Sequence, residues 1–302
     1  MQGDKILVWG IGQGYQKICN DLRWNEEIGN FEVLACVSRD DGQRCFDGRR
    51  VIKPEEIQDF IFDYIIVTAE KYYQEIITYG VNTLKIDRTK FLPGKIFVIP
   101  CFDWKRYLTI YKSNISVVSE FCYGGMLCNH LGLPFNSPFV NVRVGDKDKY
   151  QKLISRLDYY MSISPDDGKK LQKADISIEG CVAYPILWYE DIMLHGFHYS
   201  NLETFLAKWE QRRKRYNPES VFVFKVLYDE DDLKDFDRLD IKHKIGLYFE
   251  DTNREQVITI PFDRKKHTYC FANCVNEFVS SGDIFHKIDI FRLLSGEKDF
   301  KR

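Results

Sequence analysis

The stretch Lys5-Ile6-Leu7-Val8-Trp9-Gly10-Ile11-Gly12-Gln13-Gly14 decides how the first part of the chain folds. Its apolar half has the length of a buried strand, and its glycines stand where that strand would turn into a helix. Glycine permits a tight turn and lets backbone N–H groups approach a pyrophosphate at the positive end of the helix. The stretch therefore predicts a strand, a glycine-rich turn and a helix that could bind a nucleotide.

Short apolar runs alternate with helical segments over about the first ninety residues, which is the pattern of parallel strands joined by crossover helices. The predicted strands cover residues 5–9, 31–38, 64–67 and 83–86. A second series of strands and helices follows. The sequence thus predicts an α/β protein with an N-terminal parallel sheet in residues 1–100 and a second α/β domain in residues 101–302.

The candidate cofactor site combines the glycines with the end of the second predicted strand. There Asp40 could bind ribose hydroxyls, and Arg39 could instead bind a 2′-phosphate. The glycine spacing departs from Gly-x-Gly-x-x-Gly, because the third glycine stands one position early. A nucleotide, a nucleotide-sugar or a CoA-type donor would suit such a turn, and the alternative is that the glycines only shape it. The candidate cofactor-binding residues are Gly10, Gly12, Gly14, Arg39 and Asp40.

Cys122 is the candidate nucleophile of the second domain. It lies between a predicted strand and a short helix and precedes Gly124 and Gly125, so helix N–H groups could favour a thiolate and bind an oxyanion. If the segment after Tyr189 is a strand, Asp191 and His195 share one face, and the acid could orient the imidazole as a general base. We therefore predict a catalytic Cys122, His195 and Asp191; the alternative for the cysteine is a small buried hydrophobe.

Other polar residues of this domain are candidates for binding. His198 would point away from His195 in the same segment, and Arg212 lies in the basic end of a predicted helix. An acidic run at 229–232 resembles an Asp-x-Asp metal site only loosely and more simply starts a helix, so no metal is predicted. The candidate substrate-binding residues are Gly124, Gly125, His198 and Arg212.

Two resemblances to known families add to these patterns. Segments 37–41, 46–48, 51–56, 63–67 and 72–76 resemble Rossmann-like modules that accompany sugar-modifying and surface-polysaccharide enzymes. Segments 119–125, 131–138, 184–185 and 195–199, with Trp209, Arg212 and Arg213, resemble the uncharacterised exopolysaccharide biosynthesis protein family over about residues 100–300. That family's turn usually reads Asn-Asn-Cys-Trp-Gly-Gly, where this chain has Glu120, Phe121 and Tyr123 around the cysteine.

The second resemblance implies surface-polysaccharide assembly without naming a reaction. Our leading hypothesis is a transferase for a glycosyl or acyl group. The alternatives are a non-catalytic protein that binds a nucleotide or nucleotide-sugar, and an NAD(P)-dependent oxidoreductase.

Composition narrows the partners. Lys and Arg number 43 and Asp and Glu 45, so the net charge of −2 provides no general attraction to nucleic acid or anionic lipid. The apolar runs are strand-sized, which argues against membrane insertion. Nine cysteines without a Cys-x-x-Cys pair are typical of reduced thiols in the cytoplasm. We expect a cytoplasmic protein that acts on a small-molecule or saccharide substrate.

Overall fold

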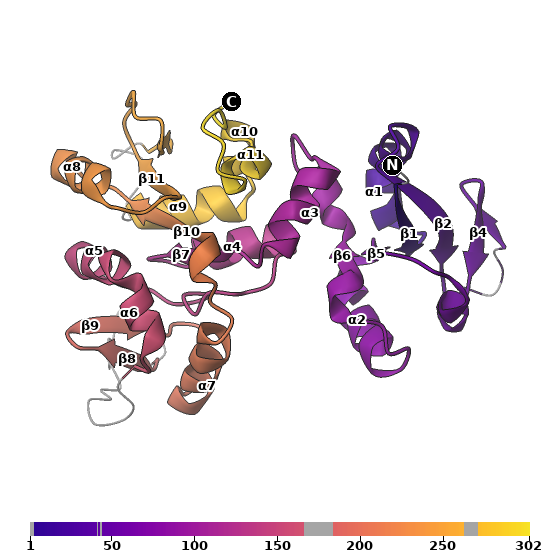
Figure 1. Cartoon of the computed structure of the whole chain (residues 1–302), viewed down its shortest axis with the longest axis horizontal. Coiled ribbons are helices and arrows are strands. Elements are labelled where there is room, and N and C mark those ends of the chain that lie inside the picture. The colour runs from indigo at the N-terminus through magenta and orange to yellow at the C-terminus, as the bar shows by residue number, and fades with distance from the viewer. Residues whose placement is uncertain (1–2, 41, 43, 166–183, 263–270) are drawn as a thin grey trace. The chain divides into compact units, whose positions relative to one another are not determined.

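The computed structural model describes residues 3–40, 42, 44–165, 184–262 and 271–302 (Figure 1). The chain divides into two compact units. Unit 1 comprises Met1–Leu108 and His130–Gly132, and unit 2 comprises Thr109–Asn129 and Leu133–Arg302. Each unit contains a sheet with parallel strands and helices, so the predicted α/β class is confirmed.

Unit 1 is built on a six-stranded sheet of order β3-β4-β2-β1-β5-β6. Its strands are β1 (Asp4–Trp9), β2 (Phe31–Val37), β3 (Cys45–Phe46), β4 (Arg49–Ile52), β5 (Tyr64–Val67) and β6 (Phe91–Pro93), and its crossover helices include α1 (Gln13–Glu27) and α2 (Tyr73–Asn82). Only β3 runs antiparallel to its neighbour. The chain turns back across the sheet between β1 and β5, which makes that point a topological switch point, where ligands bind in doubly wound sheets.

The predicted fourth strand at residues 83–86 is wrong. Helix α2 continues to Asn82, and Lys85 then adopts a positive φ of 57°, which breaks an extended conformation. The strand that pairs with β5 is instead β6, whose Leu92 and Pro93 lie opposite Ile66 and Val67. Proline is tolerated there because β6 lies at the edge of the sheet.

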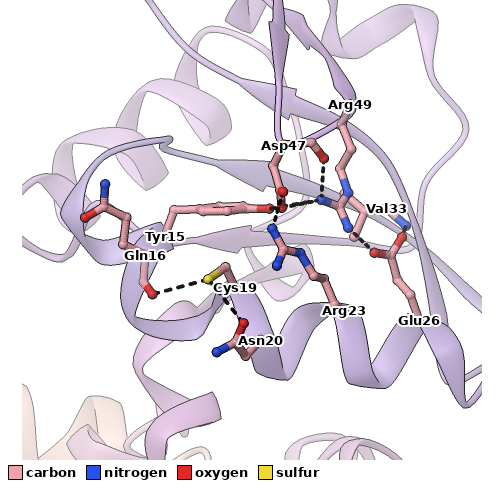
Figure 2. A network of polar contacts seen from close by, with 9 residues as sticks. All are labelled: Tyr15, Gln16, Cys19, Asn20, Arg23, Glu26, Val33, Asp47 and Arg49. Carbon is pink, nitrogen blue, oxygen red and sulfur yellow. Dashed lines mark hydrogen bonds and ion pairs between the residues drawn. The ribbon is translucent and has the colours of Figure 1, made fainter.

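A polar network ties the β3–β4 hairpin to helix α1 (Figure 2). Asp47 lies in the hairpin turn, where its carboxylate accepts a 2.5 Å hydrogen bond from the Tyr15 hydroxyl and pairs with Arg23 and Arg49. Arg49 also pairs with Glu26 of α1. The hydrogen bond from Arg23 contributes most to lowering the pKa of Asp47 to about 2. Asp47 therefore stays ionised at neutral pH, and its contacts hold the hairpin against the helix.

Unit 2 contains a four-stranded parallel sheet of order β12-β11-β10-β7 and a two-stranded antiparallel hairpin. The sheet strands are β7 (Ser116–Ser119), β10 (Val221–Val226), β11 (Lys244–Tyr248) and β12 (Val257–Thr259), and the hairpin joins β8 (Ile186–Tyr189) to β9 (Ile192–His195). From residue 104 onward the described helices are α3 (Trp104–Lys112), α4 (Tyr123–His130), α5 (Lys147–Ser155), α6 (Leu157–Ser162), α7 (Leu202–Arg213), α8 (Glu230–Arg238), α9 (Phe271–Ser280), α10 (Ile284–Lys287) and α11 (Ile290–Leu294). Helix α3 begins in unit 1, which extends to Leu108, and ends in unit 2. Parallel strands place their carboxyl ends at one edge.

One apolar cluster joins the sheet, the hairpin and the helices of unit 2. It contains Tyr150 of α5, Leu187 of β8, Trp209 of α7, Val223 of β10 and Leu233 of α8, all fully buried. The hairpin is therefore packed into the core, and the loop that follows β9 starts from a rigid base. Within the described residues, no helix is long and apolar enough to cross a membrane.

Candidate active site

The candidate active site lies where β7 ends. Strand β7 stops at Ser119, and Cys122 immediately precedes α4, whose Met126 N–H donates to the Cys122 carbonyl. Open α/β sheets bind ligands outside the carboxyl ends of their strands. Local sequence thus places the cysteine at the edge where such folds carry chemistry.

His198 is the histidine that reaches Cys122. The Cys122 Sγ lies 3.4 Å from the His198 Nε2, within hydrogen-bond range for sulfur. Cys122 is partly exposed and His198 exposed, so solvent and small molecules reach the pair. Burial raises the pKa of the Cys122 thiol, which means that the resting group is a thiol and not the thiolate we expected from the helix start. The imidazole is placed to accept the thiol proton.

The predicted pairing of Asp191 with His195 is wrong. Tyr189 and Ile192 are paired across the hairpin, so Asp191 lies in the turn between β8 and β9 and not on the strand. Its carboxylate pairs with Lys149 and, at 2.7 Å, with Lys152. A two-residue turn directs this acid to lysines of α5 instead of to the imidazole.

His195 lies on β9 and is 9% exposed. Its Nδ1 lies 3.3 Å from the Tyr184 hydroxyl, and its backbone forms two hydrogen bonds with the backbone of Arg143. Burial and the nearby Arg143 charge lower the pKa of His195, so the imidazole is neutral at pH 7. These contacts favour a structural role for His195, as part of the wall of the site, over the role of general base that we predicted.

The two glycines after the cysteine serve packing. We predicted that the Gly124 N–H binds an oxyanion. It donates instead to Ser119 Oγ at 3.1 Å and is therefore not available for one. A Cβ at Gly124 would lie 2.4 Å from Ser119 Oγ, and one at Gly125 would lie 2.9 Å from Val140 Cγ1. Glycine at both positions lets α4 approach β7 and the segment around Val140.

Arg212 is an internal support, contrary to its predicted role in substrate binding. It is 8% exposed, and its Nη1 donates to the Val140 carbonyl at 2.9 Å and to the Tyr199 hydroxyl at 2.7 Å. Tyr199 in turn donates to the Val140 carbonyl at 2.9 Å. Because Tyr199 follows His198 directly, these bonds hold the loop that carries the imidazole.

Sequence reasoning missed Arg143. Its guanidinium lies 5.2 Å from the centre of the Phe121 ring and 5.8 Å from that of Phe197. Its positive charge opposes the rise that burial causes in the pKa values of Cys122 and Glu120. The adjacent Val144 N–H donates to the Glu120 carbonyl at 2.9 Å, which holds this segment beside the start of the cysteine turn. A signal was present in the sequence, because alternating valines at 140, 142 and 144 are typical of a half-buried extended segment with Arg143 on the opposite face.

Glu120 is a buried acid two residues before Cys122, the candidate nucleophile. It is 1% exposed, and its carboxylate accepts a hydrogen bond from the Val226 N–H of β10. Burial raises its pKa to about 8, opposed by the backbone hydrogen bond and by the Lys225 and Arg143 charges, while Asp232 adds to the rise. The carboxyl is therefore mainly protonated at neutral pH.

Glu120→Gln is expected to stabilise the protein above about pH 8 by about 2 kcal/mol. The folded carboxyl binds a proton that the unfolded one releases at its ordinary pKa, so stability is lost as pH rises from about 4.5 through 8. The neutral amide abolishes this loss, although its extra N–H limits the gain. The melting temperature measured across this pH range checks the prediction, and a parallel decline in both proteins would contradict it.

Each of the three glycines in the turn of unit 1 has a different structural role. Gly10 adopts a φ of 113°. A Cβ at Gly14 would lie 1.9 Å from the Thr68 carbonyl oxygen, so this glycine allows α1 to pack on the end of β5. Nothing lies within 4 Å of a Cβ built on Gly12, the N-cap of α1. The shortened spacing thus still provides a tight turn, an open backbone position and close helix packing.

Arg39 and Asp40 both have protein partners. The Arg39 guanidinium lies 5.2 Å from the centre of the Tyr79 ring, and the Asp40 carboxylate accepts the Gly42 N–H at 3.0 Å.

Asp229 in unit 2 caps α8 by accepting the Asp232 N–H, as the helix-start interpretation of the acidic run predicted. In the described part of the chain, no three His, Cys, Asp or Glu side chains are grouped as metal ligands.

Comparison with known proteins identifies the family of the segment that holds this site. A family described as "Domain of unknown function (DUF1919)" matches residues 94–292, about two thirds of the chain. The chain belongs to the DUF1919 family. This DUF1919 segment includes Cys122, Arg143 and His198, whereas residues 2–92, with the glycine turn, match a domain described as "C2185-like, N-terminal".

A curated relative is similar in sequence to part of this chain. An uncharacterized protein of Haemophilus influenzae (strain ATCC 51907 / DSM 11121 / KW20 / Rd) is 28% identical over 137 residues, which cover 44% of this DUF1919 protein and 61% of the relative. The matched region therefore spans less than two thirds of the relative. Neither its name nor the family descriptions state a reaction.

Proposed function

We propose that this DUF1919 protein is an acyltransferase that acts in surface-polysaccharide assembly and forms a thioester on Cys122. The 3.4 Å contact between Cys122 Sγ and His198 Nε2 carries the proposal, because a thiol with an adjacent base is the arrangement of covalent acyl transfer. The resemblance of residues 100–300 to the exopolysaccharide biosynthesis family supports the pathway. A glycosyl transferase is the other form of our hypothesis, but a thiol nucleophile favours acyl chemistry.

The reaction consists of two displacements at one carbonyl carbon. His198 Nε2 accepts the Cys122 proton, and Sγ attacks the carbonyl of an acyl donor such as a CoA-type thioester. The new C–S bond forms as the donor's C–S bond breaks, and the leaving thiolate takes the proton from His198. An acceptor hydroxyl then gives its proton to His198 and attacks the thioester. The acyl group leaves as an ester, and Cys122 regains its proton.

Trapping the acyl-cysteine tests this proposal. The protein is incubated with acyl-CoA donors without an acceptor, and its peptides are analysed by mass spectrometry. We expect one hydroxylamine-sensitive acyl group on Cys122, absent from Cys122→Ala and retained in Cys101→Ala, which removes an exposed thiol of unit 1. Acyl transfer that persists in Cys122→Ala, or the absence of both adduct and transfer with all donors, would refute it.

We propose as a second candidate that unit 1 binds a nucleotide, a nucleotide-sugar or a CoA-type donor at the glycine turn. The open position at Gly12, beside the switch point between β1 and β5, favours this function. Ligand at a hundred times its Kd raises stability by about 2.7 kcal/mol, which thermal shift detects. A shift with NAD(H), NADP(H), acetyl-CoA or a UDP-, GDP- or CDP-sugar that disappears in Gly12→Val supports it. A shift with nicotinamide cofactors alone favours an oxidoreductase, and no shift with the whole panel rejects binding.

A further inference from the structure

The Arg143 side chain, near the candidate nucleophile, combines a positive charge with a buried donor that is unpaired in the described structure. Among the described residues, no ion pair or side-chain hydrogen bond of the Arg143 guanidinium is found. Its Nε is buried and unpaired. Buried donors are normally hydrogen-bonded, because an unpaired one has lost its water without compensation.

The guanidinium is held in place by its surroundings. Two backbone hydrogen bonds join Arg143 to His195 of β9, and the rings of Phe121 and Phe197 lie within cation–π distance. Two residues on, Gly145 has no side chain, and a Cβ there would lie 3.5 Å from His195 Nε2 and 3.8 Å from Arg143 Nε. No side chain at position 145 therefore stands between these two nitrogens.

Glu120 does not neutralise this cation. Glu120 lies close enough for the Arg143 charge to lower its pKa, but burial outweighs that effect and leaves the carboxyl mainly protonated at neutral pH. The carboxylate of Glu120 also accepts the Val226 N–H. Arg143 therefore presents a net positive charge next to Cys122.

We propose that Arg143 binds an anionic oxygen group, a carboxylate or a phosphate, of the substrate that reacts at Cys122. A guanidinium pairs with such groups through parallel N–H···O bonds, and the Nε donor of Arg143 is unpaired within the described structure. The assignment of this anion to a substrate rests on the proposed acyl-transfer function. The anion site itself rests on the unpaired guanidinium.

Alkylation of Cys122 by two matched reagents tests the site without any assay of turnover. Iodoacetate and iodoacetamide react alike: a bond forms between Sγ and carbon, the C–I bond breaks, iodide leaves and the thiol proton passes to His198 or solvent. Only iodoacetate carries a carboxylate. We expect the iodoacetate-to-iodoacetamide rate ratio at Cys122 to exceed that at exposed Cys101 of the same protein by about tenfold.

Arginine variants assign the effect. Arg143→Gln is expected to reduce the Cys122 ratio to that of Cys101, while Arg143→Lys retains part of the preference because the charge is kept. Arg156→Gln removes another arginine stacked on rings, those of Tyr159 and Tyr160, and should leave the ratio unchanged. Melting temperatures confirm that each variant folds.

Protection of Cys122 from iodoacetamide distinguishes the two anion classes. If phosphate slows the alkylation and acetate does not, the site binds a phosphate group. If acetate slows it and phosphate does not, the site binds a carboxylate. An unchanged ratio in folded Arg143→Gln, or protection by neither anion, would overturn the proposal. A preference that depends on Arg143 in a protein that forms no acyl-cysteine would retain the anion site and reject the acyltransferase.

Discussion

Replacing His198 with alanine is expected to lower the acyl-transfer rate by about two to four orders of magnitude at neutral pH. The resting Cys122 is a thiol whose pKa burial has raised, so few molecules carry the nucleophilic thiolate unless a base removes the proton. His198 Nε2, 3.4 Å from Sγ, is placed to do so. Without it, the rate should rise with pH as the free thiol ionises.

The pH profile of Cys122 alkylation by iodoacetamide measures how His198 changes the ionisation of the thiol. His286→Ala serves as the matched control, because it removes another exposed histidine of unit 2, on α10. It should leave both rate and profile unchanged. A His198→Ala protein with the wild-type profile would show that the imidazole is not the base.

Replacing Gly14 with alanine is expected to destabilise unit 1 by about 3 kcal/mol. The new methyl carbon would lie 1.9 Å from the Thr68 carbonyl oxygen, which belongs to the backbone at the end of β5 and cannot rotate away. Alanine is the better helix former by about 1 kcal/mol, so propensity alone predicts the opposite sign. Packing should therefore outweigh propensity at this position.

Hydrogen exchange of the full chain, read at the peptides of β1 and α1, follows unit 1 by itself. Opening should become about a hundredfold more frequent in Gly14→Ala. Gly12→Ala is the paired control, two positions away in the same turn, and a Cβ there meets nothing within 4 Å. Equal exchange in the two variants would contradict the assignment of a packing role to Gly14.

Local pattern was sufficient where neighbours in the chain determine the structure. The strand before Gly10, the helix after it and the helix start at Asp229 all follow from apolar runs, glycine and a capping acid. Local pattern predicted the edge strand at residues 83–86, whereas the structure has it at β6. Both segments are short apolar runs, so the pattern does not distinguish them. Residues 83–86 do not form a strand because α2 extends to Asn82 and Lys85 adopts a positive φ. The amino-acid composition indicates neither feature.

The sequence by itself determined the α/β class, the parallel N-terminal sheet and the place of Cys122 at the end of a strand. Only the tertiary structure decided which histidine meets the thiol. His195 and His198 are three residues apart, but the β8–β9 hairpin buries the first and the following loop brings the second to a cysteine 76 residues earlier. Periodicity assigns a side chain to a face of its own element, whereas packing among distant elements selects its partner. The same reason explains Arg143, whose Nε has no hydrogen-bond partner among the described residues because of how distant segments pack around it.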